Sequence, residues 1–277
     1  MDAFRGQLPV HEEQTRLRIG RIPYANLFPI YSMLEKIGEP HPYEFITGVP
    51  SAVNRLLREG LIDVSPSSSI EYLRRRDEYV LIDNHSISSF GPIGSILLFS
   101  KRPIETLGGL TILTTSQSET SIALLGIILS KFYDLSCPLK PADEPLAGGL
   151  ASSSAYLLIG DDALREALKW PRLHIYDLGD IWYRHTGLPF VFALWIARKS
   201  CPADSPLLFA QFRRDLDAAQ DRALRSLRDL AGKSPLKEVL SEEEIVSYWQ
   251  GISYDLGSEH LRGLELFRKY AEELRLL

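Results

Sequence analysis

The chain has 277 residues, of which 45% are hydrophobic, and its 31 basic and 36 acidic residues give a formal net charge of −5. This composition suits one large α/β domain or two lobes with a substantial buried core. Because no long basic run is present, the sequence lacks the electrostatic footprint of a nucleic-acid-binding protein, and we expect no nucleic-acid partner.

The N-terminal stretch does not resemble an export signal. Its first 18 residues contain no apolar segment of signal-peptide length, and Asp2, Glu12 and Glu13 oppose a basic leader. No segment approaches the roughly 20 apolar residues of a membrane span. We therefore expect a cytoplasmic protein without a membrane partner. Cys137 and Cys201 are too few for a disulfide scaffold and are predicted to be reduced and buried.

The first half of the chain alternates predicted strands and helices. Leu17 and Ile19 alternate with arginines, which predicts a strand, and apolar residues from Ile30 to Ile37 then follow helical spacing. The unit recurs as a strand over 43–47 and a helix that begins near Pro50 and ends before Gly60. Further strands are predicted at 61–65, 79–83 and 93–100.

A second series begins after residue 102. A short β-branched stretch at 110–116 predicts a strand, and apolar residues from Ile122 to Phe132 predict the helix after it. Residues 154–168 repeat this strand and helix, whereas 174–179 and the apolar run 188–197 predict two more strands. Charged helices with regularly spaced leucines follow from Pro202. The alternation argues for mainly parallel sheets with helices on their faces.

Hydroxyl-bearing and small residues crowd the points where four predicted strands end. In open α/β sheets, ligands bind beyond the carboxyl ends of strands, where helix N-termini present free N–H groups. These ends carry Tyr24-Ala25-Asn26, Ser65 to Ser69, Thr114 to Ser121 and Gly160-Asp161, and further serines stand at 86, 88, 89 and 95. So many neutral donors predict a ligand that carries carboxylates.

Helix capping is the competing explanation for each of these residues. Asp161 with Asp162 fits a cap, and Asn26 can hold a turn or cap the helix that Pro29 begins. One residue suffices to cap a helix, however, whereas the stretch 114–121 offers six hydroxyls. Capping therefore leaves this excess unexplained, and the excess is the functional signal.

Established catalytic and metal-binding motifs are absent from the sequence. The six histidines show no metal-ligand spacing, so no metal is predicted; they stand at 11, 41, 85, 174, 185 and 260. Glu119 is a candidate base within the hydroxyl cluster, although an acidic residue in a first helical turn is more often a partner of the helix dipole. Trp182, Tyr183 and Trp195 can either wall an apolar pocket or pack in the core.

Six segments occur in a characteristic order: GRIPYANLFPI, GVPSAVNRLLREGLIDVSPSSSIEY, SISSFGPIGSILLFSK, TTSQSETSIALL, LLIGDDAL and DLGDIWYRHTGLPFVFALW. In this order they resemble the chorismate dehydratases of the futalosine route to menaquinone, and the similarity runs from about residue 17 to 197. The resemblance implies a two-lobed α/β fold like that of the type 2 periplasmic binding proteins, which closes over a ligand. One lobe would hold residues 1–102 with 196–277, and the other 103–195.

The resemblance also implies a reaction, in which chorismate loses water to give 3-[(1-carboxyvinyl)oxy]benzoate without a cofactor. Asn26 and Glu119 are the catalytic candidates, and a carboxylate of the substrate is an alternative to Glu119 as proton acceptor. Asn26 would bond the C4 hydroxyl or the enolpyruvyl group. The expected substrate-binding residues are Tyr24, Ser68, Ser69, Ser88, Ser95, Thr115, Ser116, Thr120, Ser121, Gly160 and Asp161. We expect a monomer or a homodimer.

Two other functions remain open. A cytoplasmic sensor or binding protein for a small carboxylate would use the same scaffold, because a fold does not dictate chemistry. The other is the 1,4-dihydroxy-6-naphthoate synthase of the same pathway, whose first loop typically reads Ser-Pro-Cys-Pro-Asn-Asp-Thr. The loop here reads Ile-Pro-Tyr-Ala-Asn-Leu-Phe, which favours the dehydratase.

Overall fold

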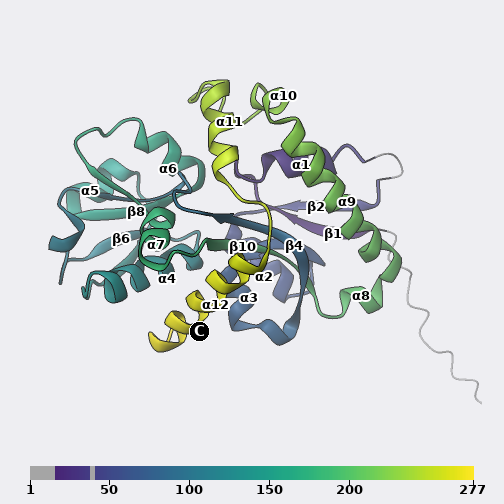
Figure 1. The fold of residues 1–277 in the computed structure, drawn as a ribbon, viewed down its shortest axis with the longest axis horizontal. Helices are drawn as coiled ribbons and strands as arrows, with labels where there is room; N and C mark the ends of the chain where they lie inside the picture. The colour runs from purple at the N-terminus through teal and green to yellow at the C-terminus, as the bar shows by residue number, and fades with distance from the viewer. Residues whose placement is uncertain (1–15, 38–40) are drawn as a thin grey trace, which may run out of the picture.

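The computed structural model describes residues 16–37 and 41–277, whose strands form two five-stranded sheets that lie side by side (Figure 1). The first sheet has the order β2-β1-β3-β10-β4, with β1 (Leu17–Arg21), β2 (Tyr43–Thr47), β3 (Val64–Ser68), β4 (Tyr79–Ser89) and β10 (Phe190–Arg198). The second has the order β7-β6-β8-β5-β9, with β5 (Ile96–Ser100), β6 (Ile112–Thr115), β7 (Leu139–Ala142), β8 (Ala155–Ile159) and β9 (His174–Asp177). We call each sheet with its helices the first and the second lobe.

In each sheet four strands run in one direction and one strand runs in the other. β1 is parallel to β2 and β3, whereas β10 is antiparallel to both β3 and β4. In the second sheet β6 is parallel to β7 and β8, whereas β5 is antiparallel to β8 and β9. The reversed strand is in both cases the first one after the chain crosses from the other lobe. The predicted mainly parallel arrangement therefore holds, with one exception in each sheet.

Twelve α-helices cover the two sheets in the part of the chain that the structure describes. They are α1 (Phe28–Leu34), α2 (Pro50–Arg58), α3 (Ser69–Arg74), α4 (Glu119–Ile127), α5 (Leu146–Ser152), α6 (Gly160–Ala167), α7 (Leu178–Thr186), α8 (Cys201–Asp204), α9 (Pro206–Arg225), α10 (Leu227–Ala231), α11 (Glu242–Gly251) and α12 (Ser258–Glu273). Short 3-10 turns at Arg76–Glu78 and Ile104–Thr106 and a π-helical turn at Ile128–Phe132 complete the set. None of these helices is both long and apolar enough to pass through a lipid bilayer.

The chain crosses between the lobes at residues 90–95 and 187–189. The first crossing contains Gly91 and Gly94, whose φ values of +113° and +76° lie in the region that favours glycine. The Asp177 carboxylate accepts hydrogen bonds from the N–H groups of Ile93 (3.2 Å) and Gly94 (2.6 Å) and also caps α7. The crossing is thereby fastened to the second lobe.

The lobe boundaries indicated by the two sheets differ from those that we expected. β5 pairs within the second sheet, although residues up to 102 were assigned to the first lobe. The expected boundary between 195 and 196 falls inside β10, which belongs to the first sheet. We therefore propose that the lobes divide at the two crossings. The apolar strands on either side of a crossing look alike in sequence, so their pattern alone does not show where one lobe ends.

Several elements also differ in extent from their prediction. β3 begins at Val64 rather than Leu61, and β4 continues to Ser89 rather than ending at Asp83. The serines at 65–68 and 86–89 therefore lie in buried strands and not in loops. Strand formation here depends on pairing with neighbouring strands, and this outweighs the weak intrinsic β-propensity of serine.

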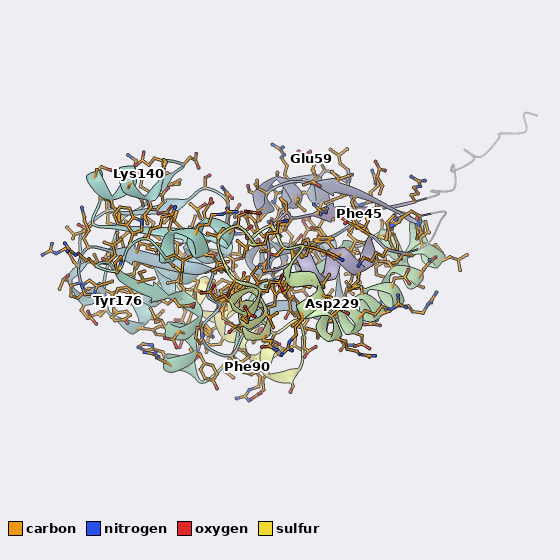
Figure 2. All side chains as sticks on the ribbon, turned by 90° about the horizontal axis from the view of Figure 1, so that it is seen from above. Phe45, Glu59, Phe90, Lys140, Tyr176 and Asp229 are labelled. Atoms are coloured by element: carbon orange, nitrogen blue, oxygen red, sulfur yellow. The ribbon has the colours of Figure 1, made fainter. Side chains whose placement is uncertain are left out.

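Helix α12 runs against both lobes. It packs on β10, α3 and α4, and a Cβ at Gly263 would lie 2.0 Å from the carbonyl oxygen of Pro189 in the second crossing. Near its end the carboxylate of Glu273 accepts a 2.6 Å bond from Lys131 of the second lobe. Figure 2 views the two lobes from above, with Lys140 on one side, Phe45 on the other and the exposed Phe90 between them.

The apolar core resolves two open expectations. Trp182 and Trp195 are buried and contact other core aromatics, so both pack in the core, whereas Tyr183 is partly exposed. Both cysteines are free thiols. Cys201 is buried, but the expectation of burial was wrong for Cys137, which is only half-buried and donates to the carbonyl of Leu107.

Candidate functional site

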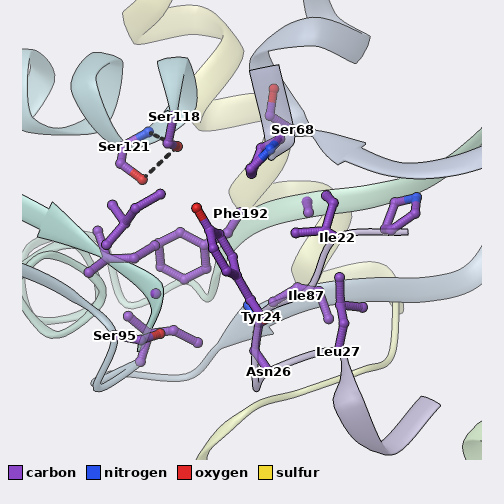
Figure 3. Close-up of a pocket in the computed structure, with 17 residues that line it drawn as sticks. Ile22, Tyr24, Asn26, Leu27, Ser68, Ile87, Ser95, Ser118, Ser121 and Phe192 are labelled. Carbon is purple, nitrogen blue, oxygen red and sulfur yellow. Dashed lines mark hydrogen bonds between the residues drawn. The ribbon is translucent and has the colours of Figure 1, made fainter. Parts of the chain in front are cut away.

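A hollow of about 620 Å³, which includes its opening to solvent, lies where strand ends from both lobes meet (Figure 3). The residues that line it come from the β1–α1 loop, α2, β3, β4, the first crossing, β5, α4, β8, α6 and β10. Its polar side chains are those of Tyr24, Asn26, Ser68, Ser95, Ser118 and Ser121. Isoleucines, prolines and Phe192 form the apolar walls.

The lining of this hollow is uncharged. None of its residues is a lysine, arginine, histidine, aspartate or glutamate. Polar groups are therefore neutral hydroxyls, one amide and backbone groups, most of which can donate hydrogen bonds. Such a lining, with apolar walls and a few converging neutral polar groups, suits an anionic ligand with an apolar body.

Asn26 lies on a loop whose backbone is held from several directions. Its carbonyl accepts a bond from the hydroxyl of Tyr254 (2.7 Å), and the carbonyl of Ala25 accepts one from Trp249 Nε1 (2.8 Å). The N–H of Ala25 donates to Asp161 of the second lobe (3.0 Å). Asn26 Oδ1 is buried and has no hydrogen-bond partner among the described residues. A buried polar atom without a partner is unusual, and here it leaves a free acceptor at the hollow.

Tyr24 spans the hollow from the first lobe to the second. Its hydroxyl donates to Gln117 Oε1, and its ring lies over Gly160, where a Cβ would be 3.4 Å from the ring carbons. Figure 3 shows this ring surrounded by the other polar residues of the site. Burial, and then the nearby carboxylates of Asp162 and Asp161, raise the pKa of the Tyr24 phenol. The phenol therefore stays protonated near neutral pH and acts as a donor.

Three serines in the hollow each accept a hydrogen bond from another residue, and for Ser68 and Ser95 the donor lies behind the hollow. Ser68 Oγ accepts from Asn54 Nδ2 (3.0 Å) and Ser95 Oγ accepts from the hydroxyl of Tyr248 (3.0 Å). Ser118 caps α4, and its Oγ accepts from the N–H of Ser121 (3.3 Å). The first turn of α4 thus begins at the hollow, where its N–H groups favour negative charge.

Ser69 and Thr120 were expected to bind a ligand, but neither lines the hollow. The Ser69 hydroxyl donates to the carbonyl of Val191 (2.6 Å), and Thr120 Oγ1 accepts from the N–H of Ile70 (3.0 Å). Both residues are buried. Because Thr120 belongs to α4 and Ile70 to α3, their bond joins the two lobes beside the hollow.

Ser88 and Ser116 also lie outside the hollow. Ser88 is buried in β4, and its hydroxyl donates to the carbonyl of Ser253 (3.1 Å). Ser116 is exposed and donates to the carboxylate of Asp143. Asp161 does not line the hollow either, because its carboxylate holds the loop that carries Asn26.

Glu119 and Thr115 are likewise engaged elsewhere. The Glu119 carboxylate forms an ion pair with Arg74 on α3, and its side chain is 48% exposed. Thr115 Oγ1 accepts from the N–H of Gln117 (3.2 Å), which shapes the turn that holds the partner of Tyr24. The structure therefore brings together Tyr24, Asn26, Ser68, Ser95, Ser121 and Gly160 out of the residues expected to bind or react.

Sequence reasoning missed three kinds of residue at the site. Ser118 stands in the hydroxyl-rich stretch but was not among the expected ligand-binding residues. The apolar walls, such as Phe192, were seen only as parts of buried strands. Tyr248, Trp249 and Tyr254 lie in and after α11, where the sequence has no motif, and only the spatial approach of α11 to the β1–α1 loop reveals them.

No group of three or more histidine, cysteine, aspartate or glutamate residues within 16–37 and 41–277 is arranged to hold a metal ion. The polar groups that converge on the hollow are neutral oxygen and nitrogen donors. These groups suit an organic anion.

Comparison with known proteins gives a family and a fold. Residues 17–273 match the sequence model of a family described as menaquinone biosynthesis. A chorismate dehydratase from Thermus thermophilus is 30% identical over 90% of this chain and 93% of its own length. A 1,4-dihydroxy-6-naphthoate synthase from the same organism is 24% identical over 88% and 82%.

Among solved structures, the periplasmic aliphatic sulphonate-binding protein SsuA from Escherichia coli superposes with a TM-score of 0.68. It covers 95% of this chain and 88% of its own at 16% sequence identity. This likeness confirms the expected fold of periplasmic-binding-protein type, with two α/β lobes.

Proposed function

The chain belongs to the menaquinone biosynthesis family, and from this premise we propose that it is a chorismate dehydratase, which converts chorismate to 3-[(1-carboxyvinyl)oxy]benzoate and water. The observation that carries the proposal is the uncharged, donor-lined hollow between the lobes. The relative named as a dehydratase is also more similar over more of its length than the relative named as a naphthoate synthase.

Chorismate matches the two kinds of surface in the hollow. The hydrocarbon faces of its diene ring suit the isoleucine, proline and Phe192 walls, and its two carboxylates suit the hydroxyls of Ser68, Ser95 and Ser118 and the first turn of α4. Fixed neutral donors in a site that excludes water stabilise an anion more strongly than the same groups do in bulk solvent. The site therefore needs no lysine or arginine to hold the two carboxylates.

The reaction breaks the C3–H and C4–O bonds of chorismate. The C3 proton and the C4 hydroxide leave together as one water, and the ring becomes aromatic, so the products are strongly favoured. The elimination involves no net oxidation or reduction, and we propose that it needs no cofactor. The contribution of the protein is to fix the conformation of the ring, remove water from it and stabilise the departing hydroxide.

We propose that a carboxylate of the substrate accepts the C3 proton. Glu119 is poorly placed for this role, because its carboxylate pairs with Arg74 outside the hollow. The lining contains no carboxylate, imidazole or amine, and the Tyr24 phenol stays protonated. A general base must reach the proton that it removes. The enolpyruvyl carboxylate of the substrate meets this condition, because the enolpyruvyl group is attached to C3 itself.

Asn26 offers a donor and a free acceptor on one neutral amide. We propose that it bonds the C4 hydroxyl or the enolpyruvyl group and so fixes the leaving group relative to the proton acceptor. An aspartate at this position would repel the dianion, which explains why an uncharged side chain suits this strand-to-helix loop.

The test is direct. We expect that purified protein mixed with chorismate will remove the cyclohexadiene absorption and yield a product lighter by one water in mass spectrometry, at a rate that a metal chelator leaves unchanged. Tight binding without conversion would instead identify a sensor. No interaction with chorismate would point to the naphthoate synthase. A cytoplasmic location and a monomeric or homodimeric state remain proposals, which cell fractionation and sedimentation of the purified protein test.

A second expectation concerns Gly160, whose φ of +61° places it in the left-handed region beneath the Tyr24 ring. Replacing Gly160 by alanine should lower kcat/KM for chorismate about tenfold. A left-handed backbone costs a non-glycine residue about 1–2 kcal/mol, and relief of this strain, together with the added methyl group, would displace the Tyr24 ring. Gly109→Ala is the matched control, since Gly109 has a φ of +74° but no atom within 4 Å of an added Cβ.

Both variants should lose similar stability in thermal unfolding, since both place a Cβ at positive φ. Only Gly160→Ala should lose activity per folded molecule. Equal steady-state activity for the two variants would show that contact between Gly160 and the Tyr24 ring does not matter for turnover.

A further inference from the structure

The serines of the hollow are backed by a layer of donors that has no contact with the hollow itself. Asn54, on α2, donates to Ser68 and is buried with 4% exposure. Tyr248, on α11, donates to Ser95 and packs its ring over Gly94 in the first crossing. Neither Asn54 nor Tyr248 is among the residues that line the hollow.

These bonds have a consequence for the direction of each serine hydroxyl. A serine hydroxyl carries a single proton, which it can donate either backwards or into the hollow. When its oxygen already accepts a bond from behind, a donor group occupies that direction, and the serine proton points elsewhere. It is then free to be donated into the hollow, and the bond behind it polarises the hydroxyl and strengthens that donation.

We propose that Asn54 and Tyr248 are positioning residues that fix the hydroxyls of Ser68 and Ser95 as donors toward the carboxylates of the substrate. The inference rests on the proposed function and deepens it, because it assigns how a site without cations holds a dianion. It also predicts selectivity, since a hollow set to donate should bind dicarboxylates in preference to neutral ligands of the same shape.

Two features of the second layer support this role. Burial raises the pKa of the Tyr248 phenol, so it remains protonated and able to donate. The Oδ1 of Asn54 is buried without a partner among the described residues, so the amide keeps an unsatisfied atom in order to present its nitrogen to Ser68. An unsatisfied buried atom costs stability, and a role in the site explains why it is present.

The test measures binding rather than turnover. Calorimetric titration would use two probes: the dianionic reaction product, 3-[(1-carboxyvinyl)oxy]benzoate, and its neutral diamide. Tyr248→Phe and Asn54→Leu should each weaken binding of the dianion about tenfold, the loss expected for one hydrogen bond to a charged group. Binding of the diamide should change less than about twofold.

A double-mutant cycle separates positioning from general damage. In a Ser95→Ala background Tyr248→Phe should have no further effect on binding of the dianion, and Asn54→Leu should behave likewise in a Ser68→Ala background. The control is Tyr156→Phe, since Tyr156 is a buried tyrosine that donates to the carbonyls of Ala142 and Glu144 away from the hollow. It should leave both affinities unchanged.

Equal losses for the dianion and the diamide, or losses that persist without the serine hydroxyl, would overturn the inference, because both results indicate a purely structural role. If the wild-type protein dehydrates chorismate but both variants bind the dianion with unchanged affinity, the inference would also be overturned, and the proposed function would stand. A wild-type protein that neither dehydrates chorismate nor binds the product would overturn the proposed function and the inference together.

Discussion

Replacing Asn26 by aspartate should lower kcat/KM for chorismate by about a thousandfold or more while the protein remains folded. Loss of a single positioned hydrogen-bonding group from an active site costs about 100- to 1,000-fold in rate. The change also places a negative charge against a dianion in a hollow whose lining is otherwise uncharged. Both effects act in the same direction.

Asn26→Leu separates the two effects. It removes the amide without adding a charge, so its loss should be about 100-fold, smaller than that of Asn26→Asp. Activity of Asn26→Asp should also recover in part as the pH falls, because protonation of the introduced carboxyl removes its charge. Steady-state assays of both variants across a range of pH would measure the two losses and the recovery at low pH.

Asn84→Asp is the matched control for the introduced charge. Asn84 is exposed in β4, where its φ of +67° is one that asparagine and aspartate both tolerate, so the same substitution there should leave kcat and KM unchanged. Circular dichroism and thermal unfolding should show folded protein for all three variants. If Asn26→Asp retained the activity of Asn84→Asp, Asn26 would have no part in the mechanism, and the loop around it would only shape the hollow.

The β1–α1 loop shows what sequence can predict about a site of this kind. Strand and helix periodicity places Asn26 at the carboxyl end of the first strand, and such ends meet at one edge of a sheet. Tyr24 lies in the same loop, Ser68, Ser121 and Gly160 follow from the same rule applied to three further strands, and all four residues line the hollow. Local pattern and the geometry of parallel strands are therefore sufficient for these residues.

The same rule does not say which hydroxyl of a cluster faces the ligand. Thr120 and Ser121 are neighbours on α4, yet Ser121 lines the hollow and Thr120 turns to the N–H of Ile70 in the other lobe. Helical rotation and the approach of the second lobe decide between them, and neither is visible in the spacing of residues. The bonds of Glu119 to Arg74 depend on the same approach.

Residues beyond 240 contribute by tertiary contact alone. Trp249 and Tyr254 hold the backbone of Ala25 and Asn26 from more than 200 positions away in the chain. Both side chains are buried. That their polar ends reach the loop of the site follows only from how α11 folds back over the first lobe (Figure 1).

Replacing Asp63 should have the opposite outcome to replacing Asn26, namely a large loss of stability with little effect on the reaction. Its carboxylate is 1% exposed and accepts bonds from Arg18 Nη2 (2.8 Å), Arg18 Nε (3.0 Å) and Arg198 Nη2 (2.7 Å). These residues join β1, β3 and β10 at the ends that lie away from the hollow. Asp63→Asn should lower the free energy of unfolding by about 3 kcal/mol, because removing one partner leaves two guanidinium groups without their counter-charge.

Asp83→Asn is the surface comparison, since Asp83 is 68% exposed and pairs with the half-exposed Arg213 at 3.2 Å. An exposed ion pair contributes less than about 1 kcal/mol, so urea unfolding should separate the two variants clearly. KM for chorismate should be unchanged in the folded fraction of Asp63→Asn, because the hollow lies at the other end of the three strands. A raised KM at full folding would mean that the two ends of this sheet are coupled, and that the Asp63 cluster sets the position of the loop that carries Asn26.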